Sequence, residues 1–217
     1  MNNRPLIGVI GGTGALGAAL ARRWAKAGEP VLIGSRDGAR AAQAAETLQA
    51  ELGAQVGHGS NEDVAARSQI LVVTVPWAAQ ADTLEQIREH AAGKLVIDTT
   101  VPLVPPKVMR VQVPEEGSAG LRAKAILGDD VTVATAFHNV AADKLARDGD
   151  LDCDVLIFSD DKDAREETGR LVVSAGLRGF QAGSLANSIA AEAMTSLLIF
   201  INKTYKIAGA GIRITGC

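Results

Sequence analysis

The sequence has few cysteines, few aromatic residues and no long block of like charge. Its two cysteines, Cys153 and Cys217, are too few for a disulfide framework or a four-ligand zinc site. Aromatic residues make up 3% of the chain, which leaves no stacking platform for nucleobases. The net charge of −3 comes from interspersed acids and bases. We therefore expect a cytoplasmic protein with reduced thiols and with neither a nucleic-acid nor a membrane partner.

Motifs for side-chain chemistry are also lacking. The chain has no G-x-S-x-G nucleophile, no H-E-x-x-H zinc motif and no cluster of metal ligands, so we expect no metal site. The apolar run Leu197–Ile201 is too short to cross a bilayer. What is present is a 47% hydrophobic chain of 217 residues, enough for a substantial core. These features favour chemistry carried by a bound small-molecule cofactor.

The glycine-rich segment near the N-terminus is the most informative motif. Residues 6–17 read LIGVIGGTGALG, an apolar strand that leads into Gly12-x-Gly14-x-x-Gly17 and then into a helix-forming run. In a dinucleotide fold the first glycine permits the tight turn, the second admits the pyrophosphate, and the third lets helix and strand approach closely. The helix N-terminus then offers N–H groups and a positive dipole to the phosphates. The segment predicts dinucleotide binding.

The end of the second expected strand indicates which dinucleotide. NAD sites usually carry an acidic residue about 20 residues after the fingerprint, where it binds the ribose 2′-hydroxyl. This chain has Ser35 and Arg36 there, followed by Arg40, while Asp37 lies beyond the strand end. A hydroxyl and forked guanidinium groups suit a 2′-phosphate. The sequence therefore favours NADP over NAD.

Strand and helix patterns alternate along the chain, which predicts an α/β fold of the Rossmann type with a doubly wound parallel sheet. Asn61 is a suitable N-cap for a short helix that ends at Arg67. The expected strands are Leu6–Ile10, Val31–Gly34, Gln55–His58, Ile70–Val75, Leu95–Ile97, Val131–Phe137, Val155–Ser159 and Arg178–Ala182. The expected helices, besides the one at Asn61, are Ala15–Ala27, Arg40–Leu52, Ala79–Ala91, Ala119–Leu127, Ala164–Ala175 and Leu185–Lys206.

The alternation loosens after Asp98, where four prolines mark an irregular connection before residue 115. We place a domain boundary near residue 150. Residues 1–150 form the expected dinucleotide-binding domain, and residues 151–217 form a smaller α/β part with a long helix that completes the second-substrate pocket and contributes to a dimer contact.

Residues that follow the strands are candidates for the reaction site, because the carboxyl edge of such a sheet faces the cofactor. Val75, Pro76 and Trp77 end one strand, and the segment 99–103 follows another. Trp77 lines the dinucleotide or caps the core. His138 follows a later strand and is the candidate catalytic residue; it is a proton donor, a polar contact for a flat ring, or a structural histidine.

Taken together, the motifs resemble those of the NADPH-dependent reductases of the deazaflavin coenzyme F-420. The resemblance extends over nearly the whole chain. Its motifs, in order, are GGTGALG at 11–17, GSR at 34–36, TVPW at 74–77, EGSAG at 116–120, TAFHNVAA at 135–142, AGSLANS at 182–188 and GIRI at 211–214. The first motif is common among Rossmann proteins, whereas the ordered set is specific.

The resemblance implies hydride transfer between nicotinamide C4 and deazaflavin C5, and a homodimer. It implies cofactor-binding roles for residues along the pyrophosphate (Gly12, Thr13, Gly14, Leu16, Gly17), at the 2′-phosphate (Ser35, Arg36, Arg40) and around the nicotinamide (Val75, Pro76, Trp77, Val101, Val140, Ala142). It implies a second-substrate pocket formed by Pro102, Leu103, His138, Asn187 and Ser188.

The chain departs from that family at two positions that bear on the second substrate. Ala141 stands where the family often has proline, and Ile189 stands where it often has an arginine that would anchor an acidic coenzyme tail. Two other functions are therefore kept as alternatives. One is an NADPH-dependent reductase of another acceptor, a flavin, ferric-flavin, imine or carbonyl; reduction of an imine or carbonyl would need His138 as a proton donor. The other is an NADP-sensing protein without turnover.

Overall fold

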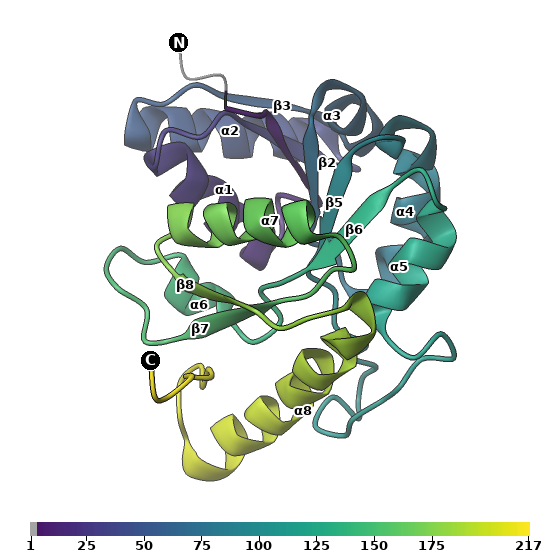
Figure 1. Cartoon of the computed structure of the whole chain (residues 1–217). Coiled ribbons are helices and arrows are strands. Elements are labelled where there is room, and N and C mark those ends of the chain that lie inside the picture. The colour runs from purple at the N-terminus through teal and green to yellow at the C-terminus, as the bar shows by residue number, and fades with distance from the viewer. Residues whose placement is uncertain (1–3) are drawn as a thin grey trace.

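A six-stranded parallel sheet with the strand order β3-β2-β1-β4-β5-β6 forms the centre of the computed structural model, which describes residues 4–217 (Figure 1). Residues 1–3, the start of the expected first domain, lie outside the described residues. Strand β1 (Ile7–Ile10) is central, because Gly8 pairs with Leu32 on one side and with Leu71 on the other. The strand order reverses direction between β1 and β4, which confirms the predicted doubly wound Rossmann fold.

The alternation of elements follows the sequence pattern closely. The other strands of the large sheet are β2 (Val31–Ser35), β3 (Val56–Ser60), β4 (Ile70–Val73), β5 (Leu95–Asp98) and β6 (Thr132–Thr135). The helices of this part are α1 (Ala15–Lys26), α2 (Gly38–Leu52), α3 (Asn61–Arg67), α4 (Trp77–Ala91), α5 (Ala119–Leu127) and α6 (Ala142–Leu145).

Hydrophobic cores cover both faces of the large sheet, because successive strand residues point to opposite sides. Val9 faces the side covered by α1, α2 and the later helix α7 (Lys162–Ser174). Ile10, the next residue, faces the side covered by α3, α4 and α5. Burial on both faces explains why β1 and β4 are continuous apolar runs rather than alternating ones.

Several boundaries differ from the sequence-based expectation. Ser60, not Asn61, caps α3: its Oγ accepts a hydrogen bond from Asp63 N at 3.0 Å, so the expected Asn61 cap was wrong. Helix α4 begins at Trp77, two residues before the expected start, directly after Pro76, whose fixed φ suits a helix N-terminus. The strand expected to reach Phe137 ends at Thr135, because Phe137 has a left-handed φ of 65°. Helix α6, a single turn, was not predicted.

The C-terminal part adds a second, two-stranded parallel sheet of β7 (Asp154–Ile157) and β8 (Arg178–Gln181). A short 3-10 turn, Leu185–Asn187, leads into α8 (Ser188–Tyr205), and the chain then turns back toward β7 (Figure 1). Trp24 Nε1 of α1 donates to Leu171 O of α7 at 2.8 Å, inside a core shared by residues before and after 150. The division into domains at residue 150 stays a prediction.

Candidate cofactor site

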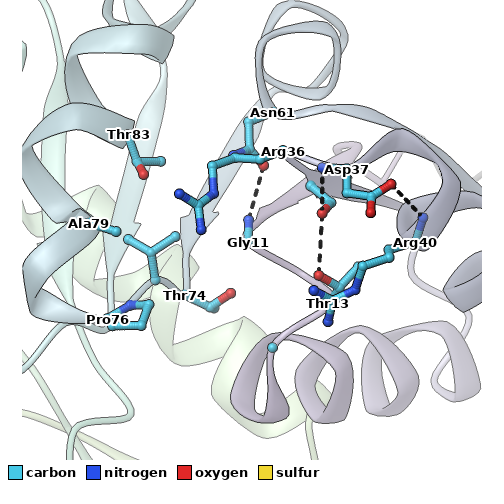
Figure 2. Close-up of a pocket in the computed structure, with 13 residues that line it drawn as sticks. Gly11, Thr13, Arg36, Asp37, Arg40, Asn61, Thr74, Pro76, Ala79 and Thr83 are labelled. Atoms are coloured by element: carbon cyan, nitrogen blue, oxygen red, sulfur yellow. Dashed lines mark hydrogen bonds between the residues drawn. The ribbon is translucent and has the colours of Figure 1, made fainter.

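A cavity of about 450 Å³ opens where the strand order reverses, between the carboxyl ends of β1 and β4. In folds of this kind this crevice is where dinucleotides bind. Figure 2 shows the side chains around it, contributed by the glycine turn, the end of β2, and the starts of α2, α3 and α4. The lining residues are Gly11, Thr13, Gly14, Ser35, Arg36, Asp37, Arg40, Asn61, Thr74, Val75, Pro76, Ala79 and Thr83.

The glycine turn has the three properties expected from the sequence. Gly12 N donates to Gly34 O at 2.8 Å, and a Cβ on Gly12 would lie 2.8 Å from Val9 O. A Cβ on Gly17 would lie 2.4 Å from Thr74 Oγ1, so this glycine lets α1 lie close to the sheet. A Cβ on Gly14 would meet nothing closer than 3.4 Å. The space at Gly14 is therefore left open on the cavity side, where a pyrophosphate fits.

The carboxyl end of β2 presents a hydroxyl and two guanidinium groups to the cavity. Ser35 Oγ accepts from Asp37 N at 3.1 Å and lies 3.4 Å from Thr13 Oγ1. Asp37 Oδ1 accepts from Ala39 N and Arg40 N, so this carboxylate caps α2. In Figure 2 the Arg36 side chain extends toward the α4 side of the cavity, and Arg40 lies near Thr13. The positive charges of Arg36 and Arg40 suit an anionic ligand in this part of the cavity.

Asn61 is a cavity residue that sequence reasoning missed. Its side chain is buried, and its Oδ1 accepts from Gly11 N at 3.2 Å, which fixes the start of the glycine turn (Figure 2). The available signal was a polar residue directly after β3, at the carboxyl edge of the sheet. Thr74 was also missed; its Oγ1 donates to Ile10 O at 2.9 Å and joins β4 to β1 beside the cavity.

Val75 and Pro76 line the cavity as expected, whereas the Trp77 side chain is not among the lining groups. The guanidinium of Arg122 on α5 lies 4.3 Å from the Trp77 ring centroid, in a cation–π contact. Trp77 therefore joins the start of α4 to α5. Both interpretations of Trp77, as a group that lines the dinucleotide or one that caps the core, stay predictions.

The loop after β5 lies beside the end of β4. Thr99 Oγ1 donates to Val73 O at 2.9 Å, and Thr100 Oγ1 donates to Val75 O at 3.4 Å. These bonds bring the segment 101–103, with its buried Pro102, to the same sheet edge as Val75. Val101, Pro102 and Leu103 are thus near the cavity but outside its lining.

The segment His138–Ala142, here called the β6 loop, follows the left-handed residue Phe137. Val140 N donates to Phe137 O at 3.4 Å, and Val140 also contacts the core. Ala142 is the first residue of α6, so its N–H has no acceptor within that helix. The role of Ala142 at the nicotinamide carboxamide, which the family resemblance implies, stays a prediction.

His138 is almost entirely buried, at 7% exposure, and its ring centroid lies 6.2 Å from that of Phe158. Burial lowers the pKa of His138 to about 4. Within residues 4–217 no hydrogen-bond partner reaches its buried Nε2 atom. The imidazole is therefore held in its neutral form at neutral pH.

A buried polar network connects the end of β5 with α8. Asp98 accepts from Gln80 Nε2 at 2.5 Å and from Thr100 Oγ1 at 2.6 Å. Gln80 Nε2 also donates to Ala119 O at 3.1 Å, and Glu192 accepts from Ala119 N at 2.7 Å. Burial raises the pKa of Asp98 to about 6 and raises the pKa of Glu192 as well.

The two expected pocket residues before and at the start of α8 have different surroundings. Ser188 is fully buried, and its Oγ donates to Glu192 Oε1 at 2.9 Å. Asn187 is exposed, and its Nδ2 donates to Ala182 O at 3.3 Å. Leu16, expected along the pyrophosphate, contacts the core instead of lining the cavity.

Comparison with known proteins explains why these motifs occur together. Residues 6–102 match the family model described as NADP oxidoreductase, coenzyme F420-dependent. The chain is 41% identical to the F420-dependent NADP reductase of Methanothermobacter thermautotrophicus, with 96% of this chain and 94% of that protein covered. It is 33% identical to the F420-dependent NADP reductase of Methanocaldococcus jannaschii, with 96% and 97% covered. The chain belongs to this family.

Solved structures share the fold of this F420-dependent oxidoreductase family member. A structure from Arthrobacter described as an F420-dependent NADP reductase superposes with a TM-score of 0.80 at 22% identity, with 97% of this chain and 99% of that chain covered. A pyrroline-5-carboxylate reductase from Coxiella burnetii superposes with a TM-score of 0.60 at 13% identity, with 96% and 73% covered. At these identities the likeness establishes the fold alone.

Proposed function

We propose that this chain is an NADP-dependent oxidoreductase that transfers a hydride between NADP(H) and the deazaflavin coenzyme F420. One observation carries the proposal: a chain related over 96% of its length to F420-dependent NADP reductases presents Arg36 and Arg40 to a Rossmann cavity. Charged, forked donors at the end of β2 recognise a 2′-phosphate. Strand β2 ends at Ser35 and carries no acidic side chain there that could bind a ribose 2′-hydroxyl. The nearest carboxylate, Asp37, caps α2.

The residues that line the cavity suit the phosphate groups of NADP(H). The open space at Gly14 and the N-terminus of α1 receive the pyrophosphate. Ser35, Arg36 and Arg40 hold the 2′-phosphate at the β2 end of the cavity. Pro76 and the amide of Ala142 border the nicotinamide.

When bound, the reduced nicotinamide supplies a hydride from C4, and the oxidised deazaflavin ring accepts it at C5. The chain contributes alignment of the two rings and exclusion of water. For the second ring we propose a pocket between Pro102, Leu103, His138 and Asn187, with the buried Ser188 behind it. His138 is a neutral polar surface in this pocket, because its pKa is lowered to about 4.

The lowered pKa of His138 also bears on the main alternative function, reduction of an imine or carbonyl acceptor. Reduction of an imine or carbonyl group needs a proton donor near the nicotinamide, and His138 was the candidate for that role. At neutral pH a histidine with a pKa of about 4 is almost entirely in its neutral form, which is a weak acid. The burial of His138 therefore favours ring-to-ring hydride transfer over imine reduction.

The test is a steady-state assay with oxidised deazaflavin and either NADPH or NADH, followed by loss of the deazaflavin absorbance. We expect turnover with NADPH to exceed that with NADH. Arg36→Ala and Arg40→Ala should each raise the KM for NADPH roughly 10- to 100-fold, since hydrogen bonds to charged groups contribute ~1.5–3 kcal/mol. The KM for NADH should barely change.

Arg88→Ala is the matched control, because Arg88 is a half-exposed arginine on α4 whose contact to Glu85 is 3.8 Å long. It should leave both KM values unchanged. NADPH oxidation with a flavin but not with deazaflavin would replace the proposed acceptor. Tight NADPH binding without turnover of any acceptor would favour an NADP sensor.

We also propose that α8 forms a homodimer contact. Its outer side exposes large apolar groups, and the segment after it continues them; these are Met194, Leu197, Phe200, Tyr205 and Ile207. The stretch Leu185–Tyr205 is long and apolar enough to cross a membrane by length and composition, with 33% of its apolar window buried. The buried Glu192 and its bonds to α5 fix the other side of α8 on the protein. A second copy of the chain is therefore the partner that we propose for the exposed side.

Light scattering coupled to size-exclusion chromatography, without detergent, tests this contact. The wild-type protein should elute with twice the chain mass of 22.5 kDa, and Leu197→Glu with Phe200→Glu should shift it to the monomer. The matched control is Val173→Glu, an exposed apolar position on α7. A monomeric wild-type protein, or one that partitions onto lipid vesicles, would contradict the dimer.

We propose a cytoplasmic location for the same protein. Cys153 and Cys217 are both free thiols, one buried and one exposed. Free thiols persist in a reducing compartment, which is also where NADPH is available as a reductant.

A further inference from the structure

We infer that the C-terminal tail, residues 207–217, is a strap that holds the β6 loop in position for hydride transfer, with Gly211 and Cys153 as its contact point. The inference rests on the proposed function, because it takes the β6 loop as the nicotinamide-binding loop. Figure 1 shows the chain reversing after α8 and returning to β7.

The tail is anchored to β7 by several bonds. Asp154 N donates to Ile212 O at 2.8 Å, and Ile214 N donates to Asp154 Oδ2 at 2.6 Å. Arg178 Nη2 bonds to both Asp154 Oδ2, at 2.8 Å, and Ile214 O, at 3.1 Å. The side chain of Asp154 is fully buried. These bonds fix the tail in one position against β7 and β8.

From this anchor the tail approaches the β6 loop too closely to admit a side chain. A Cβ on Gly209 would lie 2.7 Å from Ala141 Cβ, and one on Gly211 would lie 2.6 Å from Cys153 Sγ. Cys153 Sγ in turn donates to Asn139 O at 3.6 Å. Gly211 therefore reaches the loop mainly through the Cys153 thiol, and a Cβ on Gly211 would also lie 3.6 Å from Asn139 O, at an ordinary van der Waals distance.

The opposite side of the loop is fixed by α8. Asn139 Nδ2 donates to Ala191 O at 2.8 Å and to Thr195 Oγ1 at 3.1 Å, and Thr195 Oγ1 donates to His138 O at 2.9 Å. The loop is consequently held between α8 and the tail. A shift at Gly211 moves Asn139, and with it the neighbouring backbone of Val140 and Ala142, where the nicotinamide is expected.

Gly211 is a positioning residue in this scheme, and it offers a clean perturbation. Its φ lies outside the left-handed region, so an alanine there is penalised only by the contact with Cys153. Removing Sγ relieves the closest contact and leaves Cys153 Cβ 3.1 Å away, a distance that a shift of a few tenths of an ångström accommodates. Gly211→Ala, Cys153→Ala and the double variant therefore form a double-mutant cycle.

The experiment measures kcat with NADPH and deazaflavin, the Kd of NADPH, and amide hydrogen exchange of the β6 loop, all on the folded full-length chain. In the otherwise wild-type protein, which retains Cys153, Gly211→Ala should lower kcat at least fivefold. The Kd of NADPH should stay within about twofold, because the substitution leaves the residues that line the phosphate-binding cavity unchanged. In the Cys153→Ala background the same substitution should lower kcat less than twofold.

The matched control is Gly169→Ala on α7, whose Cβ would meet only Ile157 Cδ1 at 3.7 Å; it should leave kcat and exchange unchanged. An equal loss of kcat in both backgrounds, or a wild-type kcat in Gly211→Ala, overturns the strap. If the wild-type protein does not reduce deazaflavin, the proposed function fails, and hydrogen exchange still decides on the strap. Faster exchange at Val140 and Ala142 in Gly211→Ala, restored in the double variant, supports it, and unchanged exchange refutes it.

Discussion

Replacing His138 separates a structural from a catalytic role for this buried imidazole. Burial lowers its pKa from 6.5 to about 4, so between these values the unfolded chain binds a proton that the folded chain does not. Stability therefore rises with pH across this window and is lost as the pH falls from 6.5 toward 4. The full shift is worth ~3 kcal/mol, of which about 2 kcal/mol is lost between pH 7 and pH 5.

The assay is urea unfolding of the wild-type protein and of His138→Asn at pH 5 and at pH 7. Wild-type stability should fall by about 2 kcal/mol more than that of the variant on going to pH 5. The titration of Asp98 affects both proteins equally and cancels in the comparison. Parallel losses in the two proteins would show that His138 is not held neutral, and the reasoning from its burial would fail.

The same variant, His138→Asn, also tests the role of His138 in catalysis through its kcat. General acid catalysis typically contributes about 10²- to 10⁴-fold, so loss of a proton donor would lower kcat by at least ~100-fold. We expect His138→Asn to lower kcat less than tenfold, with the kcat profile between pH 6.5 and 8 unchanged in shape. A larger loss would restore His138 as a proton donor and would favour the imine or carbonyl reductase alternative.

Three further substitutions test other parts of the structure. Gly14→Ala should keep wild-type stability, because its Cβ would meet nothing closer than 3.4 Å, but should weaken NADPH binding at least tenfold by calorimetry. Gly17→Ala should instead lower the melting temperature, because its Cβ would lie 2.4 Å from Thr74 Oγ1; wild-type melting would contradict the close contact. Asp98 has a pKa raised to about 6, so its contribution to stability falls as the pH rises from 3.8 to 6, and Asp98→Asn should gain about 2 kcal/mol relative to wild type between pH 4 and pH 7 in urea unfolding. A constant difference would refute that sign.

The local parts of the cofactor site follow from residues close together in the chain. Gly12, Gly14 and Gly17 act within one strand-turn-helix unit, so their spacing is sufficient to predict their roles. The same holds for Ser35, Arg36 and Arg40, because the end of a strand and the first turn of the next helix are adjacent in sequence and in space. Alternating strand and helix patterns fix the sheet for a similar reason, since right-handed crossovers leave few topologies.

Other residues depend on contacts between distant segments, which no local pattern reports. Asn61 resembles a helix cap in sequence, yet Ser60 takes that role. The side-chain oxygen of Asn61 instead accepts a hydrogen bond from Gly11 N. The sequence leaves His138 as a proton donor, a polar contact or a structural histidine, and only the folded chain shows the burial that lowers its pKa. The sequence alone therefore determined the fold class and predicted the phosphate-binding residues, because both rest on backbone geometry and short-range spacing. The tertiary structure decided the burial of His138, the cap of α3 and the contact of the tail with the β6 loop, because burial and close approach exist only once the chain has folded.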